Sequence, residues 1–478
     1  MLLTFKTLFN SLRANKIIFC CWKGHSEKEL ALLGKGDLDI FVPNDFKFEF
    51  EKVAKNAGFV KVFSYQANHP FLEHYYGFDK EKLQFVHLHV YFKIVTGEHI
   101  SKNYILPLEN FIIDNIDYSS LLPEIKLNAA TNIFLLRYFL KIGSLFGLYQ
   151  YSRERSKYVN EADFLDLREK ISGIQEIGFS QEIFDQMKKT YKSSSLKKKI
   201  FLSLNIKKKL KDFRRKSFFD LHFYNFKNSI LRLFNKIFFK KNKLFERGYV
   251  FAICGIDGSG KSSIVSGLKD TFSKDFSIKV FHLGRPSSSI ISFAFKPILK
   301  IYSILKRFKK DKIIKKDLID SRNVSLAFIL RSLMLAYDRK RESSRAHNFS
   351  RQGYIVFCDR YPGILDGKMD SPRIPLNKGK SKFYQFCYQL EKDLYQSIEL
   401  ADVIFQIKVP LEVSLKRNET RNKIGKETEE ELKNRFELNS EATFQSKKIE
   451  YVDGVLPFIE VLSTICGLIW SFNFSSKD

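Results

Sequence analysis

The segment Gly255–Ser262 carries the residue types that hold a chain of phosphates, with the spacing G-x-x-x-x-G-K-S. Glycines let backbone N–H groups converge on phosphate oxygens, and a helix that begins there adds partial positive charge. Lys261 is expected to reach the β- and γ-phosphates, and the Ser262 hydroxyl to bind Mg²⁺. The sequence therefore predicts a site for ATP and Mg²⁺. The residues expected to bind ATP are Gly255, Ile256, Asp257, Gly258, Ser259, Gly260, Lys261, Ser262 and Ser263.

The elements around this phosphate-binding loop (P-loop) predict a parallel sheet. The apolar run 249–254 is typical of a buried strand, and 263–268 has helical spacing. Further strand-like runs at 277–282, 354–358, 401–408 and 449–453 alternate with helical segments, of which the longest is 324–345. This order favours an α/β fold with helices on both faces of the sheet. Because such sheets bind ligands at the carboxyl ends of their strands, we expect Asp359 to support Mg²⁺ beside the loop.

Residues 248–470 resemble the thymidylate kinase family of P-loop nucleoside monophosphate kinases, with gaps. The matching features are the loop with Asp257, the helix with Asp338 and Arg339, Gly353-x(5)-Asp359-Arg360-Tyr361, the strand from Ala401, and Pro410 with Arg417. The resemblance implies that Asp257 contacts the sugar of the acceptor and that Arg339 and Arg360 hold its phosphate, with Tyr361 beside them. It also implies a lid over ATP that includes Arg417 and Arg421. Lys261, Asp359, Arg360 and Arg339 form the expected catalytic set, and guanidinium groups suit bidentate binding of a phosphoryl group.

Three departures from that family concern the acceptor. Pro362–Pro372 replaces the stretch that reads the base, His282–Pro286 replaces the segment after the second strand, and a basic insertion, 287–322, follows it. The expected reaction transfers phosphate from ATP to dTMP or to a related small acceptor. Two alternatives stay open: a kinase for a sugar or other non-nucleotide intermediate of bacterial surface-polysaccharide synthesis, and an ATP-binding module without acceptor turnover.

In the N-terminal half, Asp37 and Asp39 lie two apart on an expected strand, 36–42, so that both carboxylates share one face and could bind a metal. A strand at 17–24 leading into the turn at Gly24 precedes them, and together they resemble the polymerase-β-type nucleotidyltransferase fold, which implies two Mg²⁺ and a third carboxylate. His87 stands where that carboxylate is expected, and His25 replaces the family's serine. The domain is an active nucleotidyltransferase, a degenerate binding or scaffold domain, or a different fold with packed histidines.

Charge and composition limit the partners and the compartment. The formal net charge is +28, and residues 192–247 contain eighteen Lys and Arg against three acids. With Phe, Leu and Ile between the lysines, residues 191–247 could be a solvated connector between domains or lie on an anionic membrane surface, and nucleic acid is a less favoured partner. The six cysteines lack C-x-x-C spacing, which suits a reducing cytoplasm. We expect a cytoplasmic protein, with peripheral attachment to the inner face of the membrane and a homodimer left open.

The expected organisation has four segments. These are a nucleotidyltransferase-like α+β domain at 1–115, a helical extension at 116–190, a basic helical connector at 191–247, and a thymidylate-kinase-like P-loop domain at 248–478. The expected fold class is α/β.

Overall fold

A computed structural model describes the chain as two compact units. The first contains Met1–Phe245 and Trp470–Asp478, and the second contains Glu246–Ile469. The described residues are 1–64, 69–98, 100–143, 145–165, 173–237, 241–290, 292–293, 297, 324–363, 365–377, 379, 381–419, 430, 433–434, 436–437, 444 and 446–475. Arg421 and residues 298–322 of the basic insertion lie outside them.

The first unit is built on a mixed sheet of eight strands in the order β10-β3-β4-β5-β2-β1-β9-β8. At its centre β2 pairs parallel with β5, and β4 pairs antiparallel with β5. The strand expected at 17–24 is shorter than predicted, since only Cys20 and Cys21 pair with β2. The strands are β1 (Cys20–Cys21), β2 (Asp37–Phe41), β3 (Phe59–Phe63), β4 (Leu72–Asp79), β5 (Gln84–Tyr91), β8 (Ile116–Asp117), β9 (Glu124–Ile125) and β10 (Lys243–Leu244), with a separate pair β6 (Ile94–Thr96) and β7 (Tyr104–Leu106).

Apolar and polar residues alternate along the central strands, so one face of this sheet is apolar and the other is polar. Leu38, Ile40 and Leu88 are buried in a core shared with Phe5 and Phe50 of two N-terminal helices. Side chains one position away, including Asp37, Asp39 and His87, point to the other face because the side-chain period of a strand is two. The helices of the apolar face are α1 (Leu3–Ala14), α2 (Lys28–Leu32) and α3 (Lys47–Asn56).

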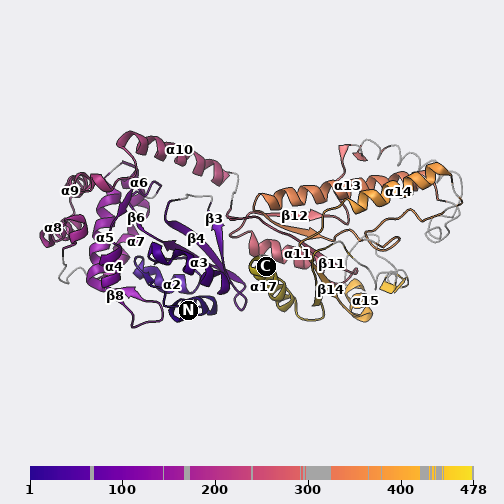
Figure 1. Cartoon of the computed structure of the whole chain (residues 1–478), viewed down its shortest axis with the longest axis horizontal. Coiled ribbons are helices and arrows are strands. Elements are labelled where there is room, and N and C mark those ends of the chain that lie inside the picture. Colours follow the sequence, from indigo (N-terminus) through magenta and orange to yellow (C-terminus); the bar gives the residue numbers. More distant parts are fainter. Residues whose placement is uncertain are drawn as a thin grey trace. The chain divides into compact units, whose positions relative to one another are not determined.

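A second core of the first unit surrounds α5, which is buried along most of its length. α8 and α9 pack against α5 and against each other (Figure 1). Leu202 and Ile206 of α9 lie in this core because a spacing of four places them on one helix face. The other helices of this unit, in chain order and including α10 outside this core, are α4 (Glu109–Asp114), α5 (Leu127–Ile142), α6 (Leu145–Arg153), α7 (Arg155–Phe164), α8 (Gln181–Lys192), α9 (Leu196–Lys209) and α10 (Phe218–Ile237).

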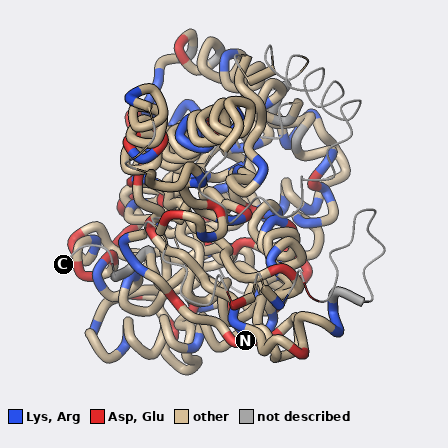
Figure 2. Tube along the Cα trace, turned by 90° about the vertical axis from the view of Figure 1, so that its right-hand side faces the viewer, with Lys and Arg blue, Asp and Glu red and all other residues tan. Residues whose placement is uncertain are grey.

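The basic stretch 191–247 does not form a separate connector. Residues up to Phe245 belong to the first unit, where α9 packs in the core and β10 extends the sheet beside β3. The described lysines and arginines of this stretch are among the blue segments of Figure 2. Among the helices that the structure describes, none has both the length and the apolar character needed to cross a membrane.

The second unit contains a five-stranded parallel sheet in the order β12-β13-β11-β14-β15. Val250, Ala252 and Cys254 of β11 face one core, and the intervening Phe251 and Ile253 are also buried, so both faces of the strand are covered. The expected α/β fold class is confirmed. The strands are β11 (Val250–Gly255), β12 (Ile278–His282), β13 (Ile355–Asp359), β14 (Val403–Lys408) and β15 (Ile449–Asp453).

Helices connect these strands and cover the sheet. α13 and α14 lie side by side along the sheet (Figure 1). They cover the face of Val356 and Cys358, while Phe357 points to the opposite face and meets Phe272 of α11. α13 begins after Ser325, whose side chain accepts a hydrogen bond from the Phe328 N–H, as expected of an N-cap. The helices are α11 (Lys261–Phe272), α13 (Leu326–Arg351), α14 (Lys382–Gln396), α15 (Leu411–Glu419) and α17 (Phe458–Ser475).

Candidate functional site

The P-loop joins the carboxyl end of β11 to the first residue of α11. Gly258 and Gly260 have φ angles of 89° and 91°, in the left-handed region that favours glycine. A Cβ atom on Gly258 would lie 2.7 Å from Ser414 Oγ, and that hydroxyl donates to the Asp257 carbonyl at 2.6 Å. Glycine is therefore required here, because α15 presses directly on the loop. α11 begins directly after the loop, and the free N–H groups and partial positive charge of its N-terminus form a binding site for an anion.

Lys261 is buried inside the loop that it is expected to serve. Its side chain is 6% exposed, and Nζ donates to the Ile256 carbonyl and lies 3.8 Å from Asp257 Oδ1. Burial, reinforced by the nearby positive charge of Arg360, lowers the pKa of Lys261 to about 8. The positive charge of the Lys261 ammonium group is thus only partly balanced by nearby acids, and a bound phosphate would provide the missing negative charge.

Ser262 and Asp359 form the expected oxygen pair beside the loop. Ser262 Oγ donates to Asp359 Oδ2 at 3.2 Å, and His282 Nδ1 lies 3.3 Å from the same oxygen. Asp359 Oδ1 is buried and has no hydrogen-bond partner among the described residues. A hydroxyl and a carboxylate with an unused oxygen are hard ligands that suit Mg²⁺, so these residues fit the ion. Ser259 Oγ is likewise buried without a partner in the described chain.

Arg360 lies between two carboxylates. Its guanidinium donates to Asp257 Oδ1 at 2.5 Å and to Asp370 Oδ2 at 3.3 Å. Burial would lower the pKa of Arg360, but the charges of Asp370 and Asp257 outweigh it and raise the pKa. A Cβ on Gly284 would lie 2.2 Å from Arg360 Cδ, so the side chain crosses this glycine directly.

Arg339, which the resemblance implies would hold an acceptor phosphate, is fully buried. It donates to the Leu283 carbonyl at 3.0 Å, to Tyr395 Oη at 2.5 Å and to Asp370 Oδ1 at 2.6 Å. Asp338, the residue before Arg339 in α13, accepts a hydrogen bond from the Ser289 N–H at 2.9 Å. Asp370 bridges Arg339 and Arg360, so Arg339 helps to hold the Asp370 carboxylate beside Arg360. Its own guanidinium is buried and already bonded, and it is not available to an acceptor.

Tyr361 is a core residue, which corrects the expectation that it contacts the acceptor. It is 0% exposed, and its hydroxyl donates to the Glu399 carbonyl at 2.6 Å and lies 3.1 Å from Ser343 Oγ and 3.2 Å from His347 Nε2. The side chain therefore faces α13 and the core behind the sheet.

The segment after Tyr361 brings in Asp370, a site residue that the sequence did not reveal. Asp370 has a φ angle of 60°, and its carbonyl accepts from the Gly363 N–H at 3.1 Å. Buried Glu391 of α14 accepts hydrogen bonds from the backbone N–H groups of Arg373 and Ile374. These contacts fix the loop, so the Asp370 carboxylate stays between the two arginines.

The two expected lid arginines have different outcomes. Arg417 donates to the Gly454 carbonyl at 2.9 Å, after β15. Arg421 lies outside the described residues. Ser263, the last residue expected to bind ATP, is exposed in the first turn of α11. The role of Arg417 stays a prediction.

The N-terminal carboxylates lie where the sequence placed them, in a different chemical environment. Asp39 Oδ1 lies 2.9 Å from Lys23 Nζ and 3.2 Å from His89 Nδ1, and Asp37 Oδ1 lies 2.6 Å from His87 Nδ1. Burial lowers the pKa of Lys23 to about 8 despite the charge of Asp39. β5 presents imidazoles opposite both acids, so this donor set does not fit two Mg²⁺ ions.

His25, the other departure from the nucleotidyltransferase pattern, is bound to a carboxylate of α7. Glu161 Oε1 accepts from the His25 N–H at 3.0 Å and lies 3.3 Å from its Nδ1, while Oε2 accepts from the N–H and the hydroxyl of Ser26. Glu161 therefore occupies the turn after Gly24 and bonds to the residue that replaces the nucleotidyltransferase serine.

Comparison with known proteins gives limited similarity. No protein-family model matches the chain. It is 24% identical over 220 residues to the uncharacterized ATP-binding protein YghS of Escherichia coli strain K12, an alignment that covers 45% of this chain and 89% of that protein. Among solved structures, the crystal structure of APE1195 is similar at 18% identity, with 47% of this chain and 96% of that chain covered and a TM-score of 0.23.

Proposed function

We propose that the chain is an ATP-dependent phosphotransferase whose site is the P-loop with Asp359 and Arg360. The observation that carries the proposal is Asp359 Oδ1, a buried oxygen without a described partner, beside the Ser262 hydroxyl. Leaving a buried acceptor unpaired costs about 1–3 kcal/mol, which Mg²⁺ binding would remove. The description of YghS as ATP-binding supports the same ligand for this chain.

Each residue has a role in this proposal. The loop N–H groups and the start of α11 bind the phosphates, and Lys261 leaves the Ile256 carbonyl to reach them. Ser262 and Asp359 hold the metal ion directly or through water. When bound, ATP supplies the γ-phosphoryl group and Mg²⁺ neutralises its charge. Arg360 stabilises the charge of the group in transfer.

The charge around Arg360 supports an acceptor with a hydroxyl group and no phosphate. Arg339 and Arg360 are balanced by Asp257 and Asp370, so the four side chains carry no net charge. A phosphate monoester such as dTMP would have to displace the Asp370 carboxylate, while a hydroxyl can donate to Asp257. We therefore favour a sugar or similar hydroxylated molecule over a nucleoside monophosphate.

An acceptor screen tests both parts of the proposal. ADP formation from ATP and Mg²⁺ is measured with sugars, nucleosides and nucleoside monophosphates including dTMP. We expect acceptor-dependent turnover with an uncharged hydroxylated compound and its loss in Lys261→Ala. Turnover with dTMP alone would contradict the acceptor class, and tight ATP binding with no turnover for any acceptor would support a binding module instead.

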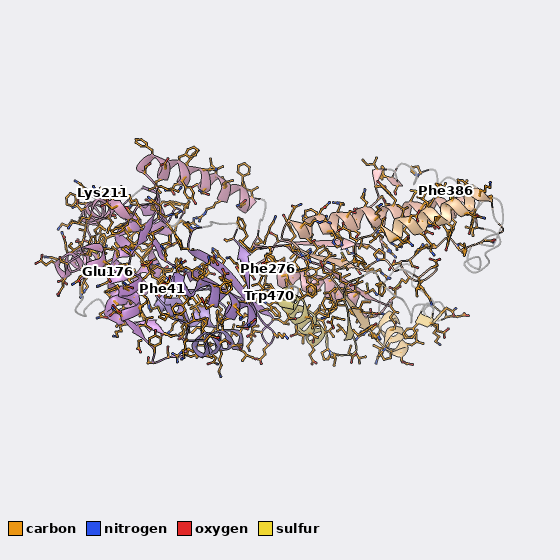
Figure 3. The ribbon with its side chains drawn as sticks, in the orientation of Figure 1. Phe41, Glu176, Lys211, Phe276, Phe386 and Trp470 are labelled. Carbon is orange, nitrogen blue, oxygen red and sulfur yellow. The ribbon has the colours of Figure 1, made fainter. Side chains whose placement is uncertain are left out.

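We also propose that α10 attaches the first unit to an anionic lipid surface. Apolar side chains recur along one side of the helix with exposed fractions from 39% to 84%, and in Figure 3 aromatic rings project from it away from the rest of the unit. The stretch 192–247 adds a net charge of +15 from eighteen Lys and Arg and three acids. An exposed apolar side in a basic segment is the pattern of helices that lie in a membrane interface. These residues are Phe219, Phe223, Phe226, Ile230, Leu231, Leu233, Phe234 and Ile237.

A further inference from the structure

Three histidines meet on one face of the sheet in the first unit, outside the proposed kinase site. They come from two neighbouring strands, with His74 on β4 and His87 and His89 on β5. His74 pairs with His89 across the antiparallel ladder, and Asp37 of β2 pairs with His87 across the parallel one. Since residues two apart on a strand share a face, three adjacent strands aim these four side chains to the same place.

The distances are close to those of a metal site. His74 Nδ1 lies 3.1 Å from His87 Nε2, and one ring nitrogen from each histidine can be chosen so that all lie within 4.8 Å of one another. Ligand nitrogens about 2.0–2.1 Å from a tetrahedral zinc ion are about 3.3 Å apart, so small side-chain rotations would close the set. Asp37 adds a carboxylate 3.8 Å from His89 Nε2 and is about half exposed.

A buried atom without a partner points to a ligand. His74 is 8% exposed, and its Nε2 has no hydrogen-bond partner within the described part of the chain. An unpaired buried ring nitrogen is costly, and among the described residues the imidazoles of His87 and His89 contact the His74 ring, with centroid distances of 5.3 Å and 4.6 Å. Rotation of these rings would direct lone pairs from all three at one ion.

Side chains next to the cluster hold His87 and His89 in place, as groups behind a metal-bound histidine commonly do. Asp39 lies 3.2 Å from His89 Nδ1 and is itself held by Lys23 at 2.9 Å, which leaves His89 Nε2 to face the cluster. Tyr76 stacks on His87 with ring centroids 4.2 Å apart. A carboxylate behind a metal-bound histidine fixes its tautomer and orientation.

We propose that His74, His87, His89 and Asp37 bind one transition-metal ion of the zinc type. Imidazoles with one carboxylate suit Zn²⁺, Co²⁺, Ni²⁺ or Cu²⁺ and suit Mg²⁺ poorly, because Mg²⁺ prefers oxygen ligands. The ion would join β2, β4 and β5 at the centre of the sheet and stabilise the first unit. This proposal is independent of the phosphotransferase site.

Metal titration of the full chain tests it. Chelator-treated protein is titrated with Zn²⁺ and with Co²⁺, whose visible absorption reports tetrahedral coordination, and Tm is measured in parallel. We expect one ion per chain, Co²⁺ absorption of tetrahedral type and a metal-dependent rise in Tm. His87→Asn should weaken binding more than tenfold, since even loss of a group behind a ligand costs 10- to 100-fold.

Two further variants keep the test decisive. Asp37→Asn retains the three imidazoles, so it should bind more weakly than wild type and more tightly than His87→Asn, and it serves if His87→Asn does not fold. Asp366→Asn, in the second unit, should keep the stoichiometry and affinity of the wild type, because Asp366 pairs with Lys392 and belongs to neither proposed metal site. No bound metal in the wild type, or equal binding by wild type and both cluster variants, would overturn the proposal.

Discussion

Replacing Asp370 with Asn tests the buried charge cluster behind the acceptor site. Asp370 is 7% exposed and lies 2.6 Å from Arg339, which is 0% exposed, and 3.3 Å from Arg360. Removing one member of a buried ion pair costs about 3–5 kcal/mol, because the other charge stays buried without compensation. Asn keeps a hydrogen-bond acceptor and tolerates the positive φ of this position, so we expect the lower end, about 3 kcal/mol.

Thermal unfolding measures this loss. In a unit of this length about 3 kcal/mol lowers Tm by about 6–12 °C. The matched control is Asp366→Asn in the same loop, because Asp366 lies 3.2 Å from Lys392 with both side chains about one-third exposed. Partly exposed pairs contribute about 0–1 kcal/mol, so this control should change Tm by a few degrees at most. Equal Tm values for the two variants would refute the buried cluster.

The same variant has a second effect, on acceptor charge. Asp370→Asn changes the net charge of the four side chains from zero to +1, as counted from Arg339, Arg360, Asp257 and Asp370. At a distance of about 5 Å one charge is worth about 1–3 kcal/mol between water-like and protein-like screening. Binding of phosphate-bearing compounds such as dTMP should therefore strengthen, as measured by calorimetry, and unchanged affinity would contradict the proposed role of Asp370.

Three further predictions concern ATP, magnesium and lipid. Burial holds the pKa of Lys261 at about 8, below its value of 10.5 in the unfolded chain. Below pH 8 the buried charge therefore lowers the free energy of unfolding, and this destabilisation disappears as the pH rises from 8 to 10.5. ATP needs the protonated lysine, so its Kd should rise above pH 8 with proton uptake on binding, measured by calorimetry in buffers of different ionisation enthalpy; a Kd that stays constant from pH 7 to 9 would contradict this. Asp359→Asn should abolish the effect of Mg²⁺ on ATP affinity while ATP alone still binds, and an unaltered Mg²⁺ dependence would remove Asp359 from the site. Wild-type protein should sediment with anionic vesicles and not with neutral ones; Phe223→Glu with Phe226→Glu should lose this, whereas Phe48→Glu, an equally exposed phenylalanine on α3, should keep it. Equal sedimentation of the two variants would exclude α10 as the lipid contact.

The parts of the site that the sequence predicted depend on local geometry. The P-loop motif encodes its own strand, turn and helix, so the sequence alone placed Lys261 and Ser262. Asp359 follows from the rule that parallel strands end at a common edge. The strands of this sheet were identifiable because each is a short strand-like run between helical segments, and the three central strands, β11, β13 and β14, are mostly apolar.

The parts that it did not predict depend on tertiary packing. The resemblance to a kinase family singled out Arg339 and Tyr361, but the burial of both side chains depends on tertiary contacts. Tyr395 of α14 bonds to Arg339, and Ser343 and His347 of α13 lie against Tyr361. Asp370 lies in a loop without a periodic pattern of apolar residues, so the sequence did not predict its contacts with Arg339 and Arg360. His74 had a usable signal, because it and His89 lie at equal distances from the turn between β4 and β5 and must pair in a hairpin.

Transfer of labelled phosphate tests the central claim most directly. Wild-type protein and Lys261→Ala are incubated with Mg²⁺ and ATP labelled at the γ-phosphate, in the presence of the hydroxylated acceptors, and the products are separated. We expect labelled acceptor with the wild-type protein and none with Lys261→Ala. Equal transfer by the two proteins would contradict it, and so would the absence of labelled acceptor from wild type that binds ATP.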